Sequence, residues 1–107
     1  MSIFSIFSKS ETDLSPSEFK EKLDGDKNAY LLDVRTSGEF KGGAIKGAKN
    51  LDFFSKNFKA ELENLPSDKN YYVYCRSGNR SGQAVKALKS KGCTAYNLDG
   101  GIMAWPY

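Results

Sequence analysis

Short apolar runs alternate with segments of helical periodicity along most of this chain, and this alternation limits the possible folds. The runs 29–34, 70–74 and 94–98 carry β-branched or aromatic side chains, as expected of strands covered on both faces. A further brief strand is predicted over 47–51. Because helical segments separate these runs, the strands should connect through βαβ crossovers. The sequence therefore predicts an α/β fold: a central parallel sheet of about five strands, flanked by helices on both faces.

The first helix is marked by its capping residues. Ser15 can cap the N-terminus, Pro16 suits the first turn, and Glu18 stands three residues after the cap. This helix should run to about Asp24 and end at Gly25.

Three further helical segments follow from spacing. A short helical turn is predicted over 36–41. A longer helix should bury one face, because its apolar positions recur at spacings of three and four: Phe54, Phe58, Leu62 and Leu65. The last helix should follow a loop at 75–80, end at Gly92 and turn four residues inward: Ala84, Val85, Ala87 and Leu88.

Length and composition indicate a single domain. The chain has 107 residues, which suits one compact unit. We expect a flexible tail over 1–11 and one domain over 12–107. The first residues contain Ile and Phe but lack the basic start and cleavage site of a signal peptide. No apolar run is long enough to span a bilayer, so no stable membrane insertion is expected.

The charge is mildly positive, with a net value of +3. It would favour small anionic substrates, but it is too weak and scattered to indicate a nucleic-acid partner. The lysines fall mostly on helical stretches, where a solvated face is the simpler interpretation.

Two cysteines and no histidine restrict the chemistry. Cys75 and Cys93 do not suggest a disulfide framework, so a reducing cytoplasm is the expected location. The absence of histidine removes Cys–His and Ser–His nucleophile pairs and most zinc or iron ligand sets. We therefore expect neither a metal nor an organic cofactor. Any reactive cysteine must be a thiolate that its surroundings stabilise.

The segment 74–82 lies between a predicted strand and a predicted helix, with Cys75 at the carboxyl end of the strand. Parallel sheets bind ligands at this edge. Gly78 and Asn79 tolerate unusual backbone angles, which would let successive amides turn inward as an anion-binding loop. The helix N-terminus and the charges of Arg76 and Arg80 would add to the effect. Such surroundings lower thiol pKa values to roughly 3.5–7.5.

A simpler interpretation is that Cys75 is an inert residue at the end of a buried strand. That interpretation does not require two arginines, two glycines and a helix start to follow it. The composition of the loop therefore favours a reactive cysteine.

Four segments together resemble the rhodanese family, in particular its single-domain members. The loop Cys75–Arg80 is similar to the family's active-site loop. Leu32–Arg35 followed by Glu39 and Phe40 resembles its Asp-Val-Arg and Glu-Phe/Tyr signature. Gly43–Ala48 resembles its Gly-His-Ile-Pro-Gly-Ala segment, and Leu98–Gly101 with Trp105 resembles its closing motif. The resemblance covers about residues 12 to 107, in the family's order.

The resemblance implies a sulfurtransferase that works through a persulfide on Cys75. The thiolate would take the outer sulfur of thiosulfate or of a persulfide donor such as glutathione persulfide. Cyanide or a cellular thiol, including that of a thioredoxin-like protein, would then accept it. The persulfide would be held by the residues of the loop, which are Arg76, Ser77, Gly78, Asn79 and Arg80. Arg76 and Arg80 would also bind the anionic donor.

The chain departs from the family's pattern at two positions. Ala44 stands where histidine is common, and Lys46 where proline is common. Since neither position is the nucleophile, we expect altered packing of that loop and retained activity.

Other residues receive supporting or structural assignments. Asp33 and Arg35 end a strand on the catalytic side, where a buried ion pair is favoured over contact with substrate. Gly100 and Gly101 should let the backbone approach the Cys75 pocket.

Two residues outside the loop are interpreted as structural. Cys93 lies near the start of the last strand. A strand of that length spans roughly 15 Å, which exceeds the ~7 Å limit on Cα separation in a disulfide. A structural role is therefore favoured over that of a resolving thiol. Trp105 is interpreted mainly as a packing residue.

Three alternatives to the enzyme remain. One alternative is a sulfur carrier or sensor domain that passes its persulfide to one partner without multiple turnover. A phosphatase or arsenate reductase would use a similar loop, but here only four residues separate Cys75 from Arg80, which makes a smaller bowl. A catalytically dead interaction module is disfavoured because the whole loop is present.

Overall fold

The computed structural model describes residues 11–107, so the predicted flexible tail lies almost entirely outside the described residues. Five parallel strands form one sheet in the order β1-β5-β4-β2-β3. The strands are β1 (Asp13–Leu14), β2 (Ala29–Asp33), β3 (Lys49–Asn50), β4 (Asn70–Tyr74) and β5 (Thr94–Leu98). The predicted α/β architecture is confirmed.

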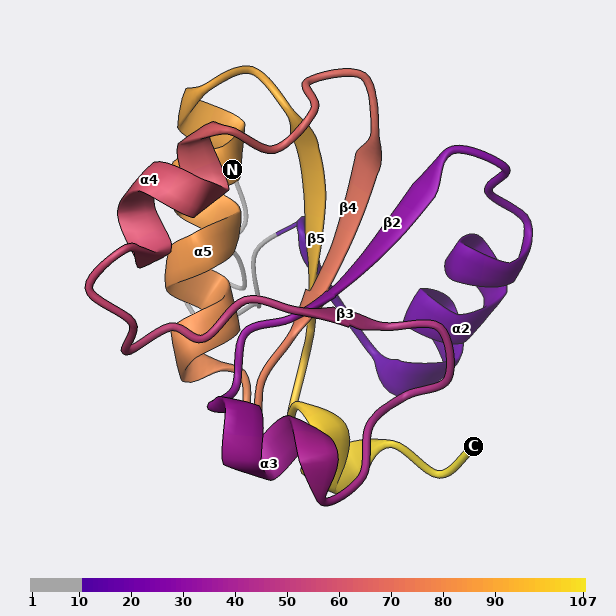
Figure 1. Ribbon diagram of the computed structural model, residues 1–107. Helices are drawn as coiled ribbons and strands as arrows, with labels where there is room; N and C mark the ends of the chain where they lie inside the picture. Colours follow the sequence, from indigo (N-terminus) through magenta and orange to yellow (C-terminus); the bar gives the residue numbers. More distant parts are fainter. Residues whose placement is uncertain (1–10) are drawn as a thin grey trace, which may run out of the picture.

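Helices cover both faces of the sheet, with α4 and α5 on one side and α2 on the other (Figure 1). The helices are α2 (Pro16–Asp24), α3 (Ser37–Lys41), α4 (Phe58–Glu63) and α5 (Asn79–Ser90), followed by the 3₁₀ helix η1 (Ile102–Ala104). The capping box of Ser15 and Glu18 forms as predicted, and Gly25 caps the other end of α2.

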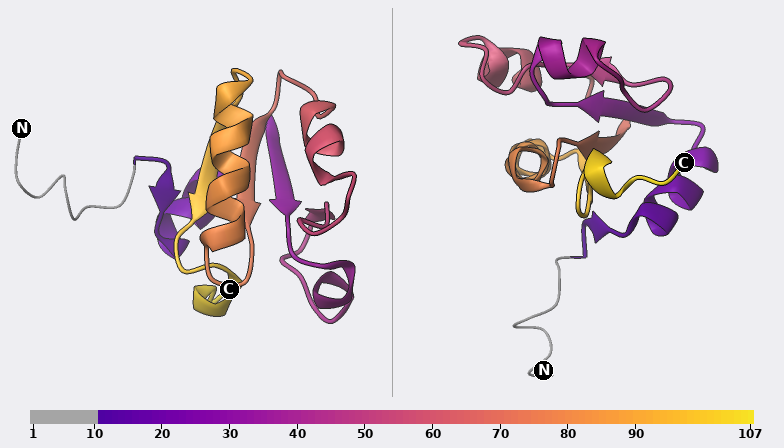
Figure 2. Two further views of the ribbon diagram at one scale, coloured as in Figure 1. Left: turned by 90° about the vertical axis from the view of Figure 1, so that its left-hand side faces the viewer. Right: turned by 90° about the horizontal axis from the view of Figure 1, so that it is seen from below.

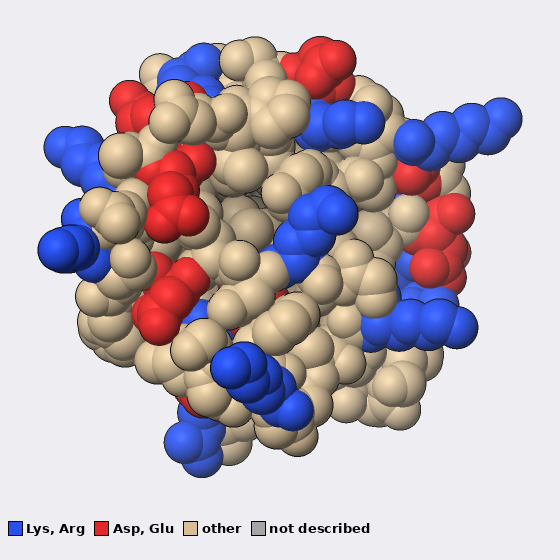
Figure 3. Space-filling view, in the orientation of Figure 1, with Lys and Arg blue, Asp and Glu red and all other residues tan. Residues whose placement is uncertain are grey.

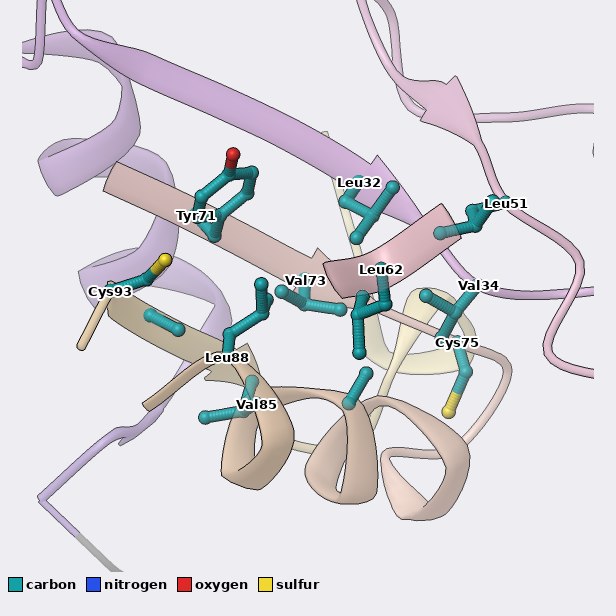
Figure 4. Packing of buried hydrophobic residues seen from close by; sticks show 12 residues of the cluster. Leu32, Val34, Leu51, Leu62, Tyr71, Val73, Cys75, Val85, Leu88 and Cys93 are labelled. Atoms are coloured by element: carbon teal, nitrogen blue, oxygen red, sulfur yellow. The ribbon is translucent and has the colours of Figure 1, made fainter. Parts of the chain in front are cut away.

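Alternate residues of the strands divide the core into two layers. Tyr71, Val73 and Cys75 belong to the apolar cluster under α4 and α5, whereas Tyr72 and Tyr74 belong to the cluster under α2. Figure 4 shows the first cluster, with Cys75 at one end and Cys93 at the other. The period of two therefore places the Cys75 side chain on the same side of the sheet as α5.

The predicted helix through Phe54 is wrong in its first turn, because α4 begins only at Phe58. The amide of Phe53 donates to the carbonyl of Val34, and the amide of Phe54 donates to the Asp52 carboxylate. These bonds hold the segment outside helical geometry. The Phe54 side chain is 69% exposed, so it does not join the buried face.

Two edge strands also differ from the prediction. The strand expected over 47–51 is limited to Lys49–Asn50. The strand Asp13–Leu14 was not predicted, because two residues carry no readable period. It is held by bonds from the Asn97 amide to the Thr12 carbonyl and from the Asp99 amide to the Leu14 carbonyl.

The carboxyl ends of β2, β4 and β5 meet at one edge of the sheet, beside α3 and η1 (Figure 2). The loop after β4 lies at this edge, and α5 begins at Asn79, slightly earlier than predicted. Within residues 11–107, no helix has both the length and the apolar character needed to cross a membrane.

Candidate active site

Cys75 follows the last residue of β4 and is 1% exposed. Its side chain lies beside the first turn of α5 (Figure 4). The sulfur accepts a hydrogen bond from the Gly78 amide at 3.1 Å and lies 3.2 Å from the Ser81 hydroxyl. The nucleophile predicted from the sequence is therefore surrounded by hydrogen-bond donors.

The loop can bring these donors to the sulfur because Gly78 has a φ of +109°. A residue with a side chain rarely adopts this value. Gly78 is the N-cap of α5, so its unusual backbone turns the chain from the strand into the helix. Asn79 is different from the prediction: it lies in the first turn of the helix, and no residue other than glycine has a positive φ among residues 11–107.

The electrostatics of the site favour the thiolate form of Cys75. Burial acts to raise the pKa of this thiol, but hydrogen bonds from the Ser81 side chain and from the amides of Ser81, Gly78 and Ser77 outweigh it. The pKa of Cys75 is consequently lowered from its ordinary value. No histidine base is required, in agreement with the absence of histidine from the chain.

Arg80 is bound to Glu39 of α3 through two hydrogen bonds of 2.8 and 3.2 Å. The bonds from Arg80 lower the pKa of Glu39 to about 2, with a further contribution from the Thr36 amide. The guanidinium also lies over the ring of Phe54, 5.5 Å from its centre. Arg80 thus connects α5 to α3 and to the segment before α4, and its charge is matched by a carboxylate.

Arg76 has different surroundings. Its side chain is exposed, and it forms no ion pair with any residue in the range 11–107. Ser77 beside it is also exposed. Of the two loop arginines, Arg76 is therefore the one whose charge faces solvent without a carboxylate partner in this part of the chain.

Asp33 and Arg35 form the buried ion pair that the sequence favoured. Both carboxylate oxygens accept hydrogen bonds from the guanidinium, at distances between 2.7 and 3.2 Å. The same guanidinium donates to the carbonyl of Gly43, and Asn50 donates to the carbonyls of Asp33 and Arg35. The pair therefore holds together the loops that follow β2 and α3.

The loop carrying the two departures from the family pattern lies at the same edge. Ala44 and Lys46 are exposed, whereas Ile45 between them is buried, and its amide donates to the Tyr74 hydroxyl. The backbone of this loop is therefore fixed to β4 at Ile45.

The glycines after β5 lie against the backbone of the loop that follows Cys75. Gly101 has a φ of +66°, and a Cβ atom there would lie 2.2 Å from the carbonyl oxygen of Arg76. Immediately afterwards, the amides of Ile102 and Met103 donate to the carbonyls of Cys75 and Arg76. Gly100 has a φ of +81° and precedes this contact. The first turn of η1 therefore clamps the start of the loop.

Three residues of the site were not predicted as functional: Ser81, Glu39 and Asn97. The hydroxyl of Ser81 is fully buried beside the sulfur, and Asn97 of β5 accepts from it. Asn97 is a polar residue in a run otherwise suited to a buried strand. Such a residue needs a hydrogen-bond partner, so this mismatch was the available signal.

Cys93 and Trp105 lie away from the sulfur of Cys75. Cys93 is a free, buried thiol at the far end of the cluster in Figure 4. The Trp105 ring packs edge-on against Phe19 at 5.8 Å, in the opposite core layer. No group of three or more potential metal ligands occurs within residues 11–107.

Charged side chains are dispersed over the visible face. In Figure 3, lysines and arginines alternate with aspartates and glutamates and do not join into one basic patch.

Comparisons with known proteins identify relatives over most of the chain. The Rhodanese-like domain family matches residues 15–106. The protein YqhL of Bacillus subtilis (strain 168) is 40% identical over 93 residues, which cover 86% of this chain and 70% of the relative. A protein named sulfurtransferase from Allochromatium vinosum is 32% identical over 94 residues, covering 87% and 86%.

Solved structures agree with these matches. The crystal structure of a rhodanese-like domain protein from Staphylococcus aureus has a TM-score of 0.75 and 32% sequence identity. The similarity covers 88% of this chain and 90% of that chain.

Proposed function

This chain belongs to the rhodanese-like domain family, and we propose that it is a sulfurtransferase that carries sulfur as a persulfide on Cys75. The observation that supports the proposal best is the set of donors around the sulfur. The Gly78 amide and the Ser81 hydroxyl both lie within about 3 Å of it, and the pKa of the thiol is lowered. A thiolate is the form that attacks a sulfur donor.

The first step transfers sulfur to the protein. The Cys75 thiolate attacks the outer sulfur of thiosulfate, a new S–S bond forms, and the S–S bond of thiosulfate breaks. Sulfite leaves with the electron pair of that bond. Glutathione persulfide would react in the same way, with the glutathione thiolate as the leaving group.

The second step regenerates the thiolate. Cyanide or an acceptor thiolate attacks the outer sulfur of the persulfide, and the bond to Cys75 breaks. The products are thiocyanate or a persulfide on the acceptor, which would be a small thiol or a thioredoxin-like protein. The two steps balance without an external oxidant or a resident cofactor.

Arg76 is proposed to bind the anionic donor and to stabilise the charge of the leaving group. Its exposure beside the nucleophile and the lack of an ion pair within residues 11–107 support this role. Arg80 is proposed to act mainly by holding the loop, because its guanidinium is already bound by Glu39. That ion pair also disfavours phosphatase chemistry, which would use the arginine on a phosphoryl group.

A cytoplasmic location is part of the proposal, and the two free cysteines are compatible with a reducing compartment.

The test is the intact mass of the reduced protein before and after incubation with thiosulfate. We expect a gain of one sulfur atom, its removal by cyanide, and repeated turnover when both reagents are present. Cys75→Ser should gain nothing, whereas the matched variant Cys93→Ala should behave as the wild type.

Two results would contradict the proposal. A mass gain that persists in Cys75→Ser would place the sulfur elsewhere. A failure to gain sulfur from either thiosulfate or glutathione persulfide would reject persulfide chemistry at this loop. A gain without turnover would favour the sulfur carrier over the enzyme.

A further inference from the structure

The Ser81 hydroxyl lies between two acceptors. Its oxygen is 3.2 Å from the Cys75 sulfur and 2.5 Å from the side-chain oxygen of Asn97. A hydroxyl carries a single proton, so it cannot donate to a thiolate and to an amide oxygen at once. Ser81 is fully buried and Asn97 is 5% exposed, so solvent does not readily replace either bond.

The orientation of the Asn97 amide is fixed by its other end. Its nitrogen donates to the Asp13 carboxylate at 2.9 Å and to the Gly78 carbonyl at 3.2 Å. Both partners are acceptors, so a flipped amide would place oxygen against oxygen at two contacts. The Asn97 oxygen must therefore face Ser81.

We propose that Ser81 is a two-position hydrogen-bond switch, and that Asn97 is a positioning residue that competes with the Cys75 thiolate for the Ser81 proton. Asp13 of β1 orients Asn97 in this competition. The proposal extends the proposed function, since it concerns how the same sulfur changes state during the reaction.

Each state of the sulfur then has its own arrangement. In the thiol form, the S–H group donates to Ser81, and Ser81 donates to Asn97. In the thiolate form, the Ser81 proton turns to the sulfur, and the Asn97 oxygen gives up its donor. In the persulfide, the negative charge lies on the outer sulfur, so the Ser81 proton returns to Asn97. The buried Asn97 oxygen thus lacks a donor when the thiolate is free, which destabilises that form, and regains its donor when Cys75 carries the persulfide.

Charged groups reach this site from four elements, α5, α3, β1 and β2. Arg80 of α5 feels the charge of Cys75 and is paired with Glu39 of α3. Asp13 of β1 has no direct bond to the sulfur and connects to it through Asn97, which contacts both Ser81 and the carbonyl of Gly78. At the end of β2, Asp33 is paired with Arg35. The competition at Ser81 is therefore separate from these ion pairs.

The experiment titrates the thiolate by its ultraviolet absorbance, in full-length protein carrying Cys93→Ala. A Cys75→Ser/Cys93→Ala protein supplies the baseline from tyrosines. Ser81→Ala should raise the pKa of Cys75, because the thiolate loses a donor. Asn97→Ala should lower it, because the thiolate loses its competitor. Each change should alter the ionisation constant about three- to tenfold, as expected for one hydrogen bond.

Two comparisons separate this switch from a general disturbance of the loop. Damage to the loop would raise the pKa of Cys75 in both Ser81→Ala and Asn97→Ala. A rise in the first variant and a fall in the second therefore indicate the switch. In a Ser81→Ala background, Asn97→Ala should no longer lower the pKa of Cys75, because no proton remains to be shared; loss of its bond to the Gly78 carbonyl acts in the opposite direction, through the Gly78 amide. Ser90→Ala, which removes an exposed hydroxyl from the same helix, should leave the titration unchanged.

The proposal is overturned if Asn97→Ala raises the pKa of Cys75 or leaves it unchanged, or if it still lowers that pKa in the Ser81→Ala background. If Asn97→Ala does not fold, Asp13→Ala serves instead. Asp13→Ala should lower the pKa of Cys75 less than Asn97→Ala does. This lowering should disappear in the Ser81→Ala background, whereas a direct effect of the Asp13 charge on the thiolate would remain there. The titration needs no sulfur donor, so its outcome is independent of whether the persulfide forms.

Discussion

Cys75 and Cys93 are both buried thiols at strand ends of the same sheet, but only Cys75 is surrounded by hydrogen-bond donors. Cys75 adjoins the carboxyl end of β4, where an amide and a hydroxyl meet its sulfur. Cys93 precedes the amino end of β5 and packs in the apolar cluster with Tyr71 and Leu88. Within residues 11–107, no hydrogen bond to the Cys93 sulfur occurs. The comparison teaches that donors, and not exposure, distinguish Cys75, the proposed nucleophile, from Cys93.

The largest expected difference is in turnover. Cys75→Ser should reduce sulfur transfer from thiosulfate to cyanide by on the order of 10³-fold or more, because the nucleophile is lost. Cys93→Ala should remain within about twofold of the wild type, because it is distant from the reacting sulfur. Thiocyanate formation measures both. Comparable losses in the two variants would remove the distinction between the cysteines.

A second comparison uses a glycine near each cysteine. Gly101→Ala would force a Cβ atom to 2.2 Å from the Arg76 carbonyl oxygen, whereas Gly92→Ala meets nothing within 4 Å. Both positions have a positive φ, of +66° and +91°. We expect Gly101→Ala to lower the free energy of unfolding by about 2–4 kcal/mol and Gly92→Ala by about 1–2 kcal/mol.

Urea unfolding measures this difference. Turnover of the folded fraction should fall only for Gly101→Ala, since only that change displaces the loop of Cys75. Equal losses of stability in Gly101→Ala and Gly92→Ala would mean that the backbone at Arg76 can move away from the added Cβ atom at no cost in free energy.

The pH dependence of the thiol gives a third, smaller effect. Because the pKa of Cys75 is lowered, its thiolate absorbance should appear below the ordinary thiol value of about 8.5 and be missing in Cys75→Ser. The lowered pKa also stabilises the folded state. This contribution to the free energy of unfolding is complete above the pKa that Cys75 has in the unfolded chain, and it is lost as the pH falls through the pKa that Cys75 has in the folded protein. A titration at or above the ordinary value would show that burial outweighs the donors.

The smallest effect concerns the ion pair beside the loop. Glu39→Gln should lower the free energy of unfolding by about 1 kcal/mol or less, since both side chains are partly exposed. The pKa of Glu39 is lowered to about 2, so the wild-type advantage should be present above the ordinary carboxyl value and disappear as the pH falls toward about 2. Urea unfolding at a series of pH values measures it; an advantage that persists at the acidic end would assign it to packing.

The sequence was sufficient for the parts of the fold with strong local signals. The strands 70–74 and 94–98 and the capped helix from Pro16 appear where expected. The helix expected from Phe54 failed because bonds to Asp52 and Val34 hold that segment, and those bonds depend on tertiary structure.

The same division applies to the site. Cys75 and its loop were identified from consecutive residues. The contacts of Ser81 with Asn97 and of Arg80 with Glu39 join residues 16 and 41 positions apart, so no local pattern contains them. The close approach of Gly101 to Arg76 likewise depends on how β5 returns to the edge of the sheet.

The bonds from Ile102 and Met103 to the carbonyls of Cys75 and Arg76 join residues that are synthesised at different times. Translation proceeds from the amino end, so the loop of Cys75 is made well before the residues that bind its first carbonyls. A nascent chain that ends before Gly101 therefore has the cysteine but lacks the contacts that shape its loop. The backbone contacts that shape this loop are therefore complete only when the end of the domain has been synthesised.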